Sequence, residues 1–326
     1  MSIKISVIIP TYKRYRLLLL CLNALRQQNF AKDEFEIIVV CDGPDAETFQ
    51  HVEFFKEEFG CKNIHIENLS AKKGPAAARN YGVSKAKGLM LAFTDDDCKP
   101  KKDWLLSYWR AWSKNSWNEI AFTGKTLVPT KAPPTDYEKN ISHLQTAEFI
   151  TANCACTKNA FIKAGGFDEQ FPIAWREDSD FHFKLIAKAV PIQKINEAVV
   201  IHPVRKATWG VSISDQKKAF YDVLLFKRHP YLFRRKIKSG PIINYYAIIC
   251  FTVLTLLSLL ARQRSASILF AVITALFISL FIVKRLKGTS KRPAHIFEML
   301  VTSMIIPFLS VYWTLRGSLR YKKLLL

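Results

Sequence analysis

The chain has 326 residues, of which 49% are hydrophobic and 23% charged, and its net charge is +21. This composition is globular, and the length allows one large domain or a domain with an appendage. The charge is uneven, because 15 Lys or Arg residues and one acidic residue, Glu298, follow residue 230. Basic clusters that flank long apolar runs indicate an anionic lipid surface and argue against nucleic acid as the partner.

The seven cysteines are odd in number and form no CxxC pair, so they predict neither a disulfide framework nor a zinc knuckle. Cys154 and Cys156 are interpreted as small core residues on one face of a strand. The first residues, MSIKISVIIPTYKR, lack an apolar core of signal-peptide length. We therefore expect the catalytic part to stay in the cytoplasm, with reduced thiols.

The first 230 residues alternate β-branched runs with amphipathic stretches. The pattern predicts strands at 3–9, 35–40, 63–66 and 89–94, and helices at 15–28, 45–59, 75–85 and 104–112. This alternation predicts an α/β fold with a doubly wound, mainly parallel sheet that binds ligands at the carboxyl ends of its strands. The proline-containing stretch 128–136 is predicted to be a surface loop.

Residues 231–326 are predicted to form a separate basic membrane-anchoring region after a catalytic domain at 1–230. Two uncharged runs, 242–261 and 265–283, can each cross a hydrocarbon core of about 30 Å. Only three residues separate them, which predicts a helical hairpin. A third helix is predicted at 296–315, and Pro307 is expected to break it.

The placement of Lys and Arg predicts how these helices meet the membrane. Basic residues precede the first run and follow the second, so both ends of the hairpin should be cytoplasmic. The third run is at the short limit for spanning and is followed by four cations. We expect it to lie in the interface or to re-enter, which leaves the carboxy terminus cytoplasmic in a multi-pass protein of the inner or plasma membrane.

Three consecutive carboxylates end the apolar run at 89–94. Such crowding is unfavourable unless a cation or hydrogen-bond donors compensate it. In a strand, Asp95 and Asp97 would point to one face and Asp96 to the other. Asp95 and Asp97 are therefore predicted ligands for Mg²⁺ or Mn²⁺, which prefer carboxylates together with substrate phosphates. A solvated acidic turn is the structural alternative.

Other candidate substrate-binding residues follow strands or begin a helix, where a doubly wound sheet binds nucleotides. A helix start rich in small residues lets a diphosphate approach closely. Two of these residues have ordinary alternatives, a common turn for Asp42 and a solvated helix charge for Arg79. The candidates of this group are Pro10, Thr11, Tyr12, Asp42, Gly74 and Arg79, and Asp95 and Asp96 of the acidic triplet are further predicted substrate-binding residues.

A second acidic group, Glu177, Asp178 and Asp180, precedes a predicted helix at 181–188. An acceptor hydroxyl must lose its proton as it attacks a sugar, so a carboxylate is needed there as general base. Asp178 is the predicted base and Glu177 a substrate-binding residue, while helix capping is the alternative, especially for Asp180. His202 follows a strand at 199–201 and is either a metal ligand or a structural histidine.

Taken together, six motifs resemble family 2 glycosyltransferases over about residues 3–230. The motifs are IIPTYKR (8–14), VVCDG (39–43), KKGPAAARNYG (72–82), AFTDDDCKPKKDWL (92–105), GGFDEQF (165–171) and REDSDF (176–181). The resemblance implies a GT-A fold, a nucleotide-diphosphate-sugar donor with a UDP-sugar favoured, a divalent metal and inversion at the anomeric carbon.

By position, the resemblance implies the role of each candidate. Asp97 would be the more direct metal ligand, Asp95 would touch ribose or metal, and Asp178 would be the base. Pro10, Tyr12 and Asp42 would line the nucleotide pocket, with Arg79 near uracil or diphosphate. The family often has two acidic residues at the second strand, whereas this chain has Cys41 in the first of these places.

The expected acceptor is a lipid-linked or cell-surface saccharide, and polyprenyl phosphate is the alternative within the same family. An inactive transferase domain that serves as a membrane scaffold is the non-enzyme alternative. The intact acidic motifs argue against that scaffold. A nicotinamide enzyme is excluded because no GxGxxG follows the first strand, and no QxxRW motif indicates a processive synthase.

Overall fold

The computed structural model describes residues 2–114 and 116–325, which form two compact units. Unit 1 comprises Met1–Pro129 and Ser142–Val204, and unit 2 comprises Thr130–Ile141 and Arg205–Leu326. The sequence predicts that the catalytic domain ends at residue 230. The two units describe compactness and not catalysis, so this boundary stays a prediction.

Unit 1 is built on one eight-stranded sheet with the order β3-β2-β1-β4-β7-β6-β8-β5. The strands β3, β2, β1 and β4 are parallel, β7 is antiparallel to both of its neighbours, and β8 is parallel to β6. The predicted mainly parallel α/β sheet is thus confirmed. The strands are β1 (Ile5–Thr11), β2 (Phe35–Cys41), β3 (Ile64–Asn68), β4 (Met90–Phe93), β5 (Lys99–Pro100), β6 (Ala121–Leu127), β7 (Cys154–Thr157) and β8 (Ile192–Ile201).

Helices cover both faces of this sheet, because successive strand residues bury their side chains on opposite sides. Val7 joins the core under α1, α2 and α4, whereas its neighbour Ile8 joins the core under α3, α6 and α7. The helices and short 3₁₀ turns of unit 1 are α1 (Tyr15–Arg26), α2 (Ala46–Phe59), α3 (Pro75–Lys85), α4 (Trp104–Ser113), η1 (His143–Gln145), η2 (Thr151–Asn153), α6 (Lys158–Ala164) and α7 (Glu177–Ala187).

The strands and helices expected up to residue 113 are present, with ends shifted by one or two residues. β4 ends at Phe93, one residue earlier than predicted, and the three aspartates lie in the turn that follows, so the strand alternation used to separate Asp96 from Asp95 and Asp97 does not apply to them. The backbone N–H of Cys98 donates to the carbonyl of Asp95 and closes this turn. Cys154 and Cys156 are buried in β7, and all seven cysteines are free thiols.

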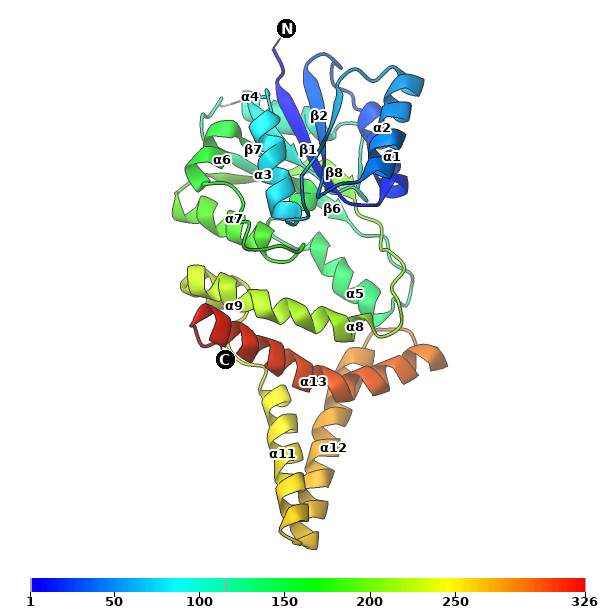
Figure 1. The fold of residues 1–326 in the computed structure, drawn as a ribbon, viewed down its shortest axis with the longest axis vertical. Helices are drawn as coiled ribbons and strands as arrows, with labels where there is room; N and C mark the ends of the chain where they lie inside the picture. The colour runs from blue at the N-terminus through cyan, green and yellow to red at the C-terminus, as the bar shows by residue number, and fades with distance from the viewer. Residues whose placement is uncertain (1, 115, 326) are drawn as a thin grey trace. The chain divides into compact units, whose positions relative to one another are not determined.

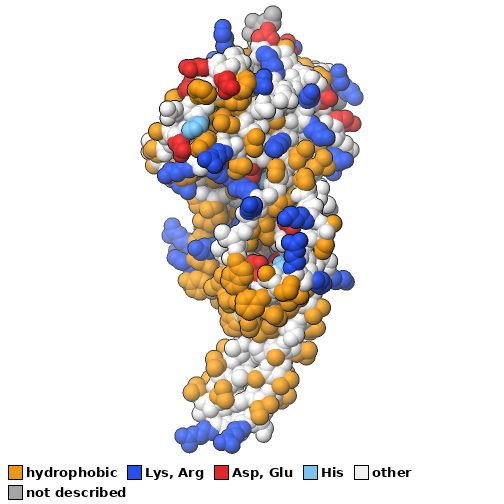
Figure 2. Space-filling model, turned by 90° about the vertical axis from the view of Figure 1, so that its right-hand side faces the viewer, with side chains coloured by type: hydrophobic (Ala, Val, Ile, Leu, Met, Phe, Trp, Pro, Cys, Tyr) orange, Lys and Arg blue, Asp and Glu red, His pale blue; other side chains and the backbone are white. Residues whose placement is uncertain are grey.

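Unit 2 is helical, and three of its helices are long and apolar enough to cross a membrane by length and composition. Figure 1 shows α11 and α12 side by side as a hairpin, with α13 lying crosswise at the end of the hairpin away from its turn. On the face shown in Figure 2, the hairpin carries basic side chains at its tip and no charged side chains along its length. The elements are α5 (Asp136–Ser142), α8 (Val211–Ser214), η3 (Asp215–Lys218), α9 (Ala219–Arg228), α10 (Pro230–Lys236), α11 (Ile243–Leu260), α12 (Arg264–Leu286) and α13 (Pro293–Tyr321).

The third apolar run forms a longer helix than expected, and the predicted break at Pro307 was wrong. α13 continues for 29 residues through this proline. Proline lacks an N–H for the bond to the carbonyl four residues earlier and its ring crowds that carbonyl, a cost that packing of the helix against its neighbours can offset. Pro307 and Ile306 are both buried, so the helix is held by its neighbours at this point.

A buried arginine joins four elements of unit 2. The Arg285 guanidinium donates to the Asp136 carboxylate of α5 at 2.8 Å and to the Ser212 hydroxyl of α8 at 3.1 Å. These two bonds come from Nη2, and Nη1 donates to the hydroxyls of Thr302 and Ser303 of α13 at 2.7 and 2.9 Å. Because Arg285 lies on α12, these bonds tie α5, α8 and α13 to the end of the hairpin and satisfy a charge that water does not reach.

We predict that Asp136→Ala destabilises unit 2 by about 3 kcal/mol, because it leaves a buried guanidinium without its anion. The matched control is Asp215→Ala, which breaks a partly exposed pair with Lys218 and should cost less than about 1 kcal/mol. Hydrogen exchange of the α5 and α13 amides measures the opening of this unit. Equal effects of the two substitutions would show that the Arg285 cluster contributes no more than a surface pair.

Candidate active site

The topology of the sheet brings most of the predicted site residues to one edge. β1, β2 and β4 are parallel neighbours, so the residues that follow them lie together at their carboxyl ends. β8 runs in the same direction as β4, because two antiparallel steps separate β6 from β4 and β8 is parallel to β6. His202, the residue after β8, therefore reaches the same edge as Asp95 and Asp97.

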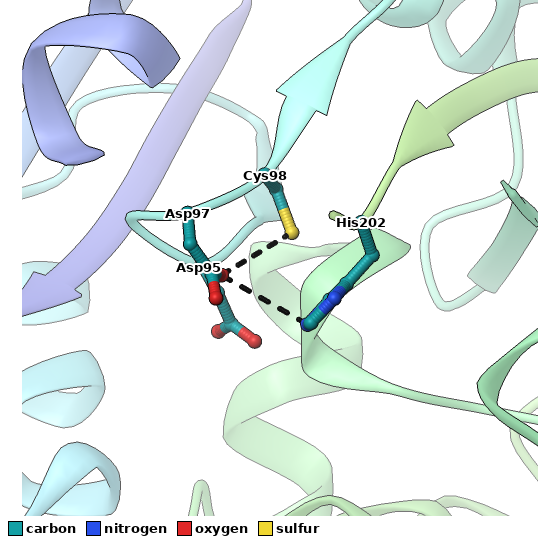
Figure 3. Close-up of side chains that lie close together, drawn as sticks. All are labelled: Asp95, Asp97, Cys98 and His202. Atoms are coloured by element: carbon teal, nitrogen blue, oxygen red, sulfur yellow. Dashed lines mark hydrogen bonds and ion pairs between the residues drawn. The ribbon is translucent and has the colours of Figure 1, made fainter. Parts of the chain in front are cut away.

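Four side chains converge in the turn after β4 and at the end of β8 (Figure 3). One ligand atom from each of Asp95, Asp97, Cys98 and His202 lies within 4.8 Å of the others. The Nε2 atom of His202 is 3.9 Å from Oδ1 of Asp97, and Sγ of Cys98 is also 3.9 Å from that oxygen. Such spacing leaves room for one ion between the carboxylate and the imidazole.

The chemistry of these groups fits a divalent cation. Carboxylate oxygens and imidazole nitrogen are ligands of Mn²⁺, and carboxylates are also ligands of Mg²⁺. Nε2 is the ring nitrogen of His202 that faces Asp97, whereas Nδ1 is buried and has no hydrogen-bond partner among the described residues. Cys98 is fully buried against the apolar core, and burial holds the pKa of its thiol well above the ordinary value. The neutral thiol is therefore a poorer ligand than the two aspartates and the histidine.

Arg79 connects the metal motif to the second acidic group. Its guanidinium donates to Oδ1 of Asp95 at 2.7 Å and to Oε1 of Glu177 at 3.1 Å, and only 2% of the residue is exposed. Glu177 is also buried. A buried guanidinium between two carboxylates fixes both of them in place. The predicted contact of Arg79 with a diphosphate or uracil stays a prediction.

Glu177 and Asp178 lie in the first turn of α7, whose N-cap residue Arg176 has a left-handed backbone at φ 74°. No side chain caps the helix there, and Oδ1 of Asp178 accepts from the backbone N–H of Ser179 at 2.6 Å. Burial and the neighbouring Asp178 charge raise the pKa of Glu177 to about 7, against the opposing charge of Arg79. Burial also raises the pKa of Asp178, which makes its carboxylate a stronger base.

At the end of β2, Asp42 is occupied in holding the start of α3. Its Oδ1 accepts from the backbone N–H groups of Lys73 and Gly74 at 2.7 and 2.8 Å. Gly74 has φ 101°, and a Cβ atom there would lie 2.4 Å from the Pro172 carbonyl oxygen. The loop before α7 thus packs directly on the start of α3, and only glycine fits between them.

Asp96, the middle aspartate of the triplet, has its partners near the carboxyl end of β1. Asp96 is fully buried, accepts from the Thr11 hydroxyl at 2.8 Å and pairs with Arg14 at 3.0 Å. Burial raises its pKa to about 6, with Arg14 and Thr11 opposing the shift. Arg14 ends the motif that contains Thr11, but no sequence pattern marked it as a site residue. Substrate contacts of Thr11 and Asp96 stay predictions.

The remaining candidates lie at the end of β1. Pro10 is a buried strand residue paired with Val40. Tyr12 presents its ring to two ammonium groups, with Nζ of Lys72 4.6 Å and Nζ of Lys13 5.4 Å from the ring centre. The two ammonium groups attract negative charge such as that of nucleotide phosphates, and the half-buried ring offers a face on which a base can stack. A separate cavity of about 640 Å³, lined by Arg26 and Phe59 among others, contains none of the predicted site residues.

We predict that Gly74→Ala lowers the free energy of unfolding by about 3 kcal/mol, because it combines a disfavoured backbone conformation with a collision against Pro172. Gly165→Ala is the matched control, since Gly165 has φ 79° but nothing within 4 Å of an added Cβ, and it should cost about 1 kcal/mol. The shifts in the midpoint of thermal unfolding compare the two. Equal shifts would show that the Pro172 contact imposes no constraint.

The raised pKa of Glu177 predicts a pH dependence of stability in the presence of a chelator. The folded protein keeps this proton up to about pH 7, whereas the ordinary value is 4.5. Folded protein therefore binds more protons across this window, so its stability falls as pH rises through it. Glu177→Gln should make the unfolding midpoint less sensitive to pH between these values. An unchanged slope in this variant would contradict the prediction.

Comparison with known proteins agrees with this geometry. Residues 6–164 match the profile of Glycosyl transferase family 2. Glycosyltransferase AglE of Haloferax volcanii is 28% identical over 214 residues, which cover 62% of this chain and 67% of that protein. The poly(ribitol-phosphate) beta-N-acetylglucosaminyltransferase TarS of Staphylococcus aureus is 37% identical over 94 residues, but this match spans only 16% of that protein.

Solved structures share the fold at low sequence identity. The mannosyltransferase PcManGT of Pyrobaculum calidifontis, in complex with GDP-Man and Mn²⁺, superimposes with a TM-score of 0.58 at 16% identity, covering 96% of this chain and 88% of that one. Residues 1–349 of S. aureus TarS in complex with UDP give a TM-score of 0.50 at 18% identity, covering 98% and 92%. Residues 6–164 thus form a glycosyltransferase family 2 domain, and the chain shares its fold with solved GT-A structures.

Proposed function

We propose that this chain is a metal-dependent, inverting glycosyltransferase that moves a sugar from a nucleotide-diphosphate-sugar to an acceptor at the cytoplasmic membrane face. One observation carries the proposal. The carboxylates of Asp95 and Asp97, the imidazole of His202 and the Glu177–Asp178 pair meet at one edge of the sheet, with Arg79 bonded to both acidic groups. This arrangement supplies a cation site and a general base side by side.

The donor would lie across the carboxyl ends of β1, β2 and β4, with Tyr12 facing the nucleotide. Asp97 and His202 would hold a divalent cation, with Asp95 completing the site or touching ribose. When bound, Mn²⁺ or Mg²⁺ neutralises the charge of the departing diphosphate. The PcManGT structure contains GDP-Man and Mn²⁺ and a TarS structure contains UDP. We favour a UDP-sugar, because the resemblance to the family implies it.

Asp178 would act as general base. The acceptor oxygen attacks the anomeric carbon, its proton passes to the Asp178 carboxylate, and the bond from that carbon to the diphosphate oxygen breaks with its electron pair leaving on the diphosphate. A single displacement of this kind inverts the anomeric carbon. Asp178 is half-buried, and burial raises its pKa, so the carboxylate is open to an acceptor and more basic than a solvated aspartate.

Unit 2 would anchor the enzyme in the inner or plasma membrane. In the apolar 18-residue stretches of α11 and α12, only 6% is buried inside the protein, whereas 39% of the corresponding stretch of α13 is buried. A helix that buries so much of its surface in protein, and lies crosswise to the hairpin (Figure 1), suits the interface rather than the hydrocarbon core. The basic residues then place both ends of the hairpin and the carboxy terminus in the cytoplasm.

A lipid-linked or cell-surface saccharide is the proposed acceptor, since the anchor would hold the enzyme where such acceptors occur. The similar TarS is named as a transferase that acts on a polymer, poly(ribitol-phosphate). Polyprenyl phosphate is the second candidate, favoured by the cations that flank the apolar helices. An inactive scaffold is disfavoured, because the buried bonds of Arg79 maintain two acidic groups that a scaffold does not need.

A donor panel tests the function. Purified full chain is incubated with UDP-, GDP- and other nucleotide sugars, with Mn²⁺, Mg²⁺ or a chelator, and release of nucleoside diphosphate is measured. We expect release that requires the metal and one preferred nucleotide, with a UDP-sugar the first candidate. Polyprenyl phosphate and lipid-linked saccharide are then supplied as acceptors to separate the two acceptor classes. Failure of every donor to react would support the scaffold alternative.

Two substitutions should separate metal binding from base catalysis. Asp97→Asn should abolish metal-dependent nucleotide binding, because a hard cation loses an anionic ligand. Asp178→Asn should keep donor affinity and lower turnover by roughly 10²–10⁴-fold. Calorimetry with and without Mn²⁺ measures the first effect and steady-state kinetics the second. Glu58→Gln, at an exposed position of α2, is the control that should change neither. The assignments are wrong if the two effects are exchanged.

A further inference from the structure

The last turns of α13 pack closely on α9, which fixes where the carboxy-terminal cations lie. A Cβ atom at Gly317 of α13 would be 2.7 Å from the Phe220 carbonyl oxygen and 3.0 Å from the Val223 side chain, both on α9. The Phe220 ring also lies 5.2 Å from the Tyr321 ring. With glycine at this crossing, the two helix backbones come into contact.

The same packing brings two basic segments together that are far apart in the sequence. The Phe226 ring of α9 faces Arg234 of α10 at 4.8 Å and Lys323 of the carboxy-terminal tail at 5.5 Å. That tail is ordered, because Leu325 is buried and its N–H donates to the Ser318 hydroxyl at 3.3 Å. The two segments therefore form one surface, with its cations held in place.

This surface, here called the α10–α13 basic surface, combines cations with exposed apolar side chains. Across residues 219–238 and 316–323 there are ten Lys or Arg residues and one acidic residue, Asp222. Tyr231 and Leu319 are 71% and 82% exposed beside these cations. Its basic residues are Lys227, Arg228, Arg234, Arg235, Lys236, Lys238, Arg316, Arg320, Lys322 and Lys323.

The position of the surface relative to the first apolar helix determines what it can meet. Lys238 precedes the start of α11 at Ile243 by five residues, so the basic segment lies at the end of the hairpin opposite its turn. Cations at such a position face lipid headgroups, and exposed leucine and tyrosine beside them suit the boundary of headgroups and acyl chains. Nucleic acid would meet only the cations and would leave these apolar side chains in water.

We propose that the α10–α13 basic surface binds the headgroups of anionic phospholipids such as phosphatidylglycerol, and so gives the anchor a preference for an anionic leaflet. This inference rests on the proposed insertion of the α11–α12 hairpin. The cations supply the attraction, the contacts of Gly317 and Phe226 preorganise them, and Leu319 and Tyr231 lie at the acyl boundary. Free phosphate would be attracted by the cations but would make no use of the exposed apolar side chains.

The test uses the full chain reconstituted in phosphatidylcholine bilayers with spin-labelled phosphatidylglycerol or phosphatidylcholine. Spin-label spectra give the relative association constant of the two lipids for the protein. The triple variant Arg235→Gln, Arg320→Gln and Lys323→Gln removes one exposed cation from each of α10, α13 and the tail. A near-surface cation contributes roughly a fivefold factor, so we expect the preference for phosphatidylglycerol to fall about tenfold or more.

The control variant removes three exposed cations from unit 1, by Lys85→Gln, Lys114→Gln and Lys188→Gln. It should change the preference by less than about twofold, because these charges lie far from the hairpin in sequence and outside the surface. An equal loss in both variants, or no preference in the unsubstituted chain, would overturn the proposal. So would displacement of the labelled lipid by inorganic phosphate at constant ionic strength, because it would show a general anion site.

Failure of the proposed function is recognised separately. Extraction of the unsubstituted chain by alkaline carbonate would show that the hairpin is not inserted, whatever the lipid preference. Donor hydrolysis by the triple variant should equal that of the unsubstituted chain, because none of its three positions belongs to the candidate active site. Loss of hydrolysis together with loss of lipid preference would contradict a surface that binds only headgroups.

Discussion

The candidate active site at the carboxyl ends of the strands depends on one buried arginine, Arg79. Asp95 and Glu177 lie on segments more than 80 residues apart, and Arg79 bonds to both. Without that guanidinium, two carboxylates would be brought together with little water to screen them. Burial and the charge of Asp178 already raise the pKa of Glu177 to about 7. Arg79 thus makes it possible to hold the proposed cation ligands and the proposed base at the same edge.

Sheet topology supplies the rest of the arrangement. The parallel strands β1, β2 and β4 deliver Thr11, Asp42 and Asp95 to one edge, and β8 returns in the same direction to deliver His202. Short polar contacts then fix the loops, such as the Asp42 carboxylate on the backbone of Gly74. The match to the family is consistent with this arrangement, in which a common α/β framework holds candidate functional residues in the loops after its strands.

Much of this was predictable from sequence, because it follows from local pattern. Alternating apolar runs predicted the strands, and the acidic residues after them predicted which side chains gather at this edge, while their role as metal ligands stays a proposal. What escaped prediction depends on contacts between distant segments. The partnership of Asp96 with Arg14, the approach of Pro172 to Gly74 and the burial of α13 that carries its helix through Pro307 have no signal in local sequence. Propensity alone treats proline as a break, whereas tertiary packing overrides it.

A crystal structure with Mn²⁺ and a nucleoside diphosphate tests most directly whether these groups form a metal-diphosphate site. Anomalous scattering locates manganese independently of any assumed ligand, and both UDP and GDP should be used. One manganese peak is predicted between Asp97 and His202, bonded also to the diphosphate, with the nucleotide beside Tyr12. Ordered nucleotide at this edge without manganese, or manganese bound away from Asp97, would contradict the assignment of the active site.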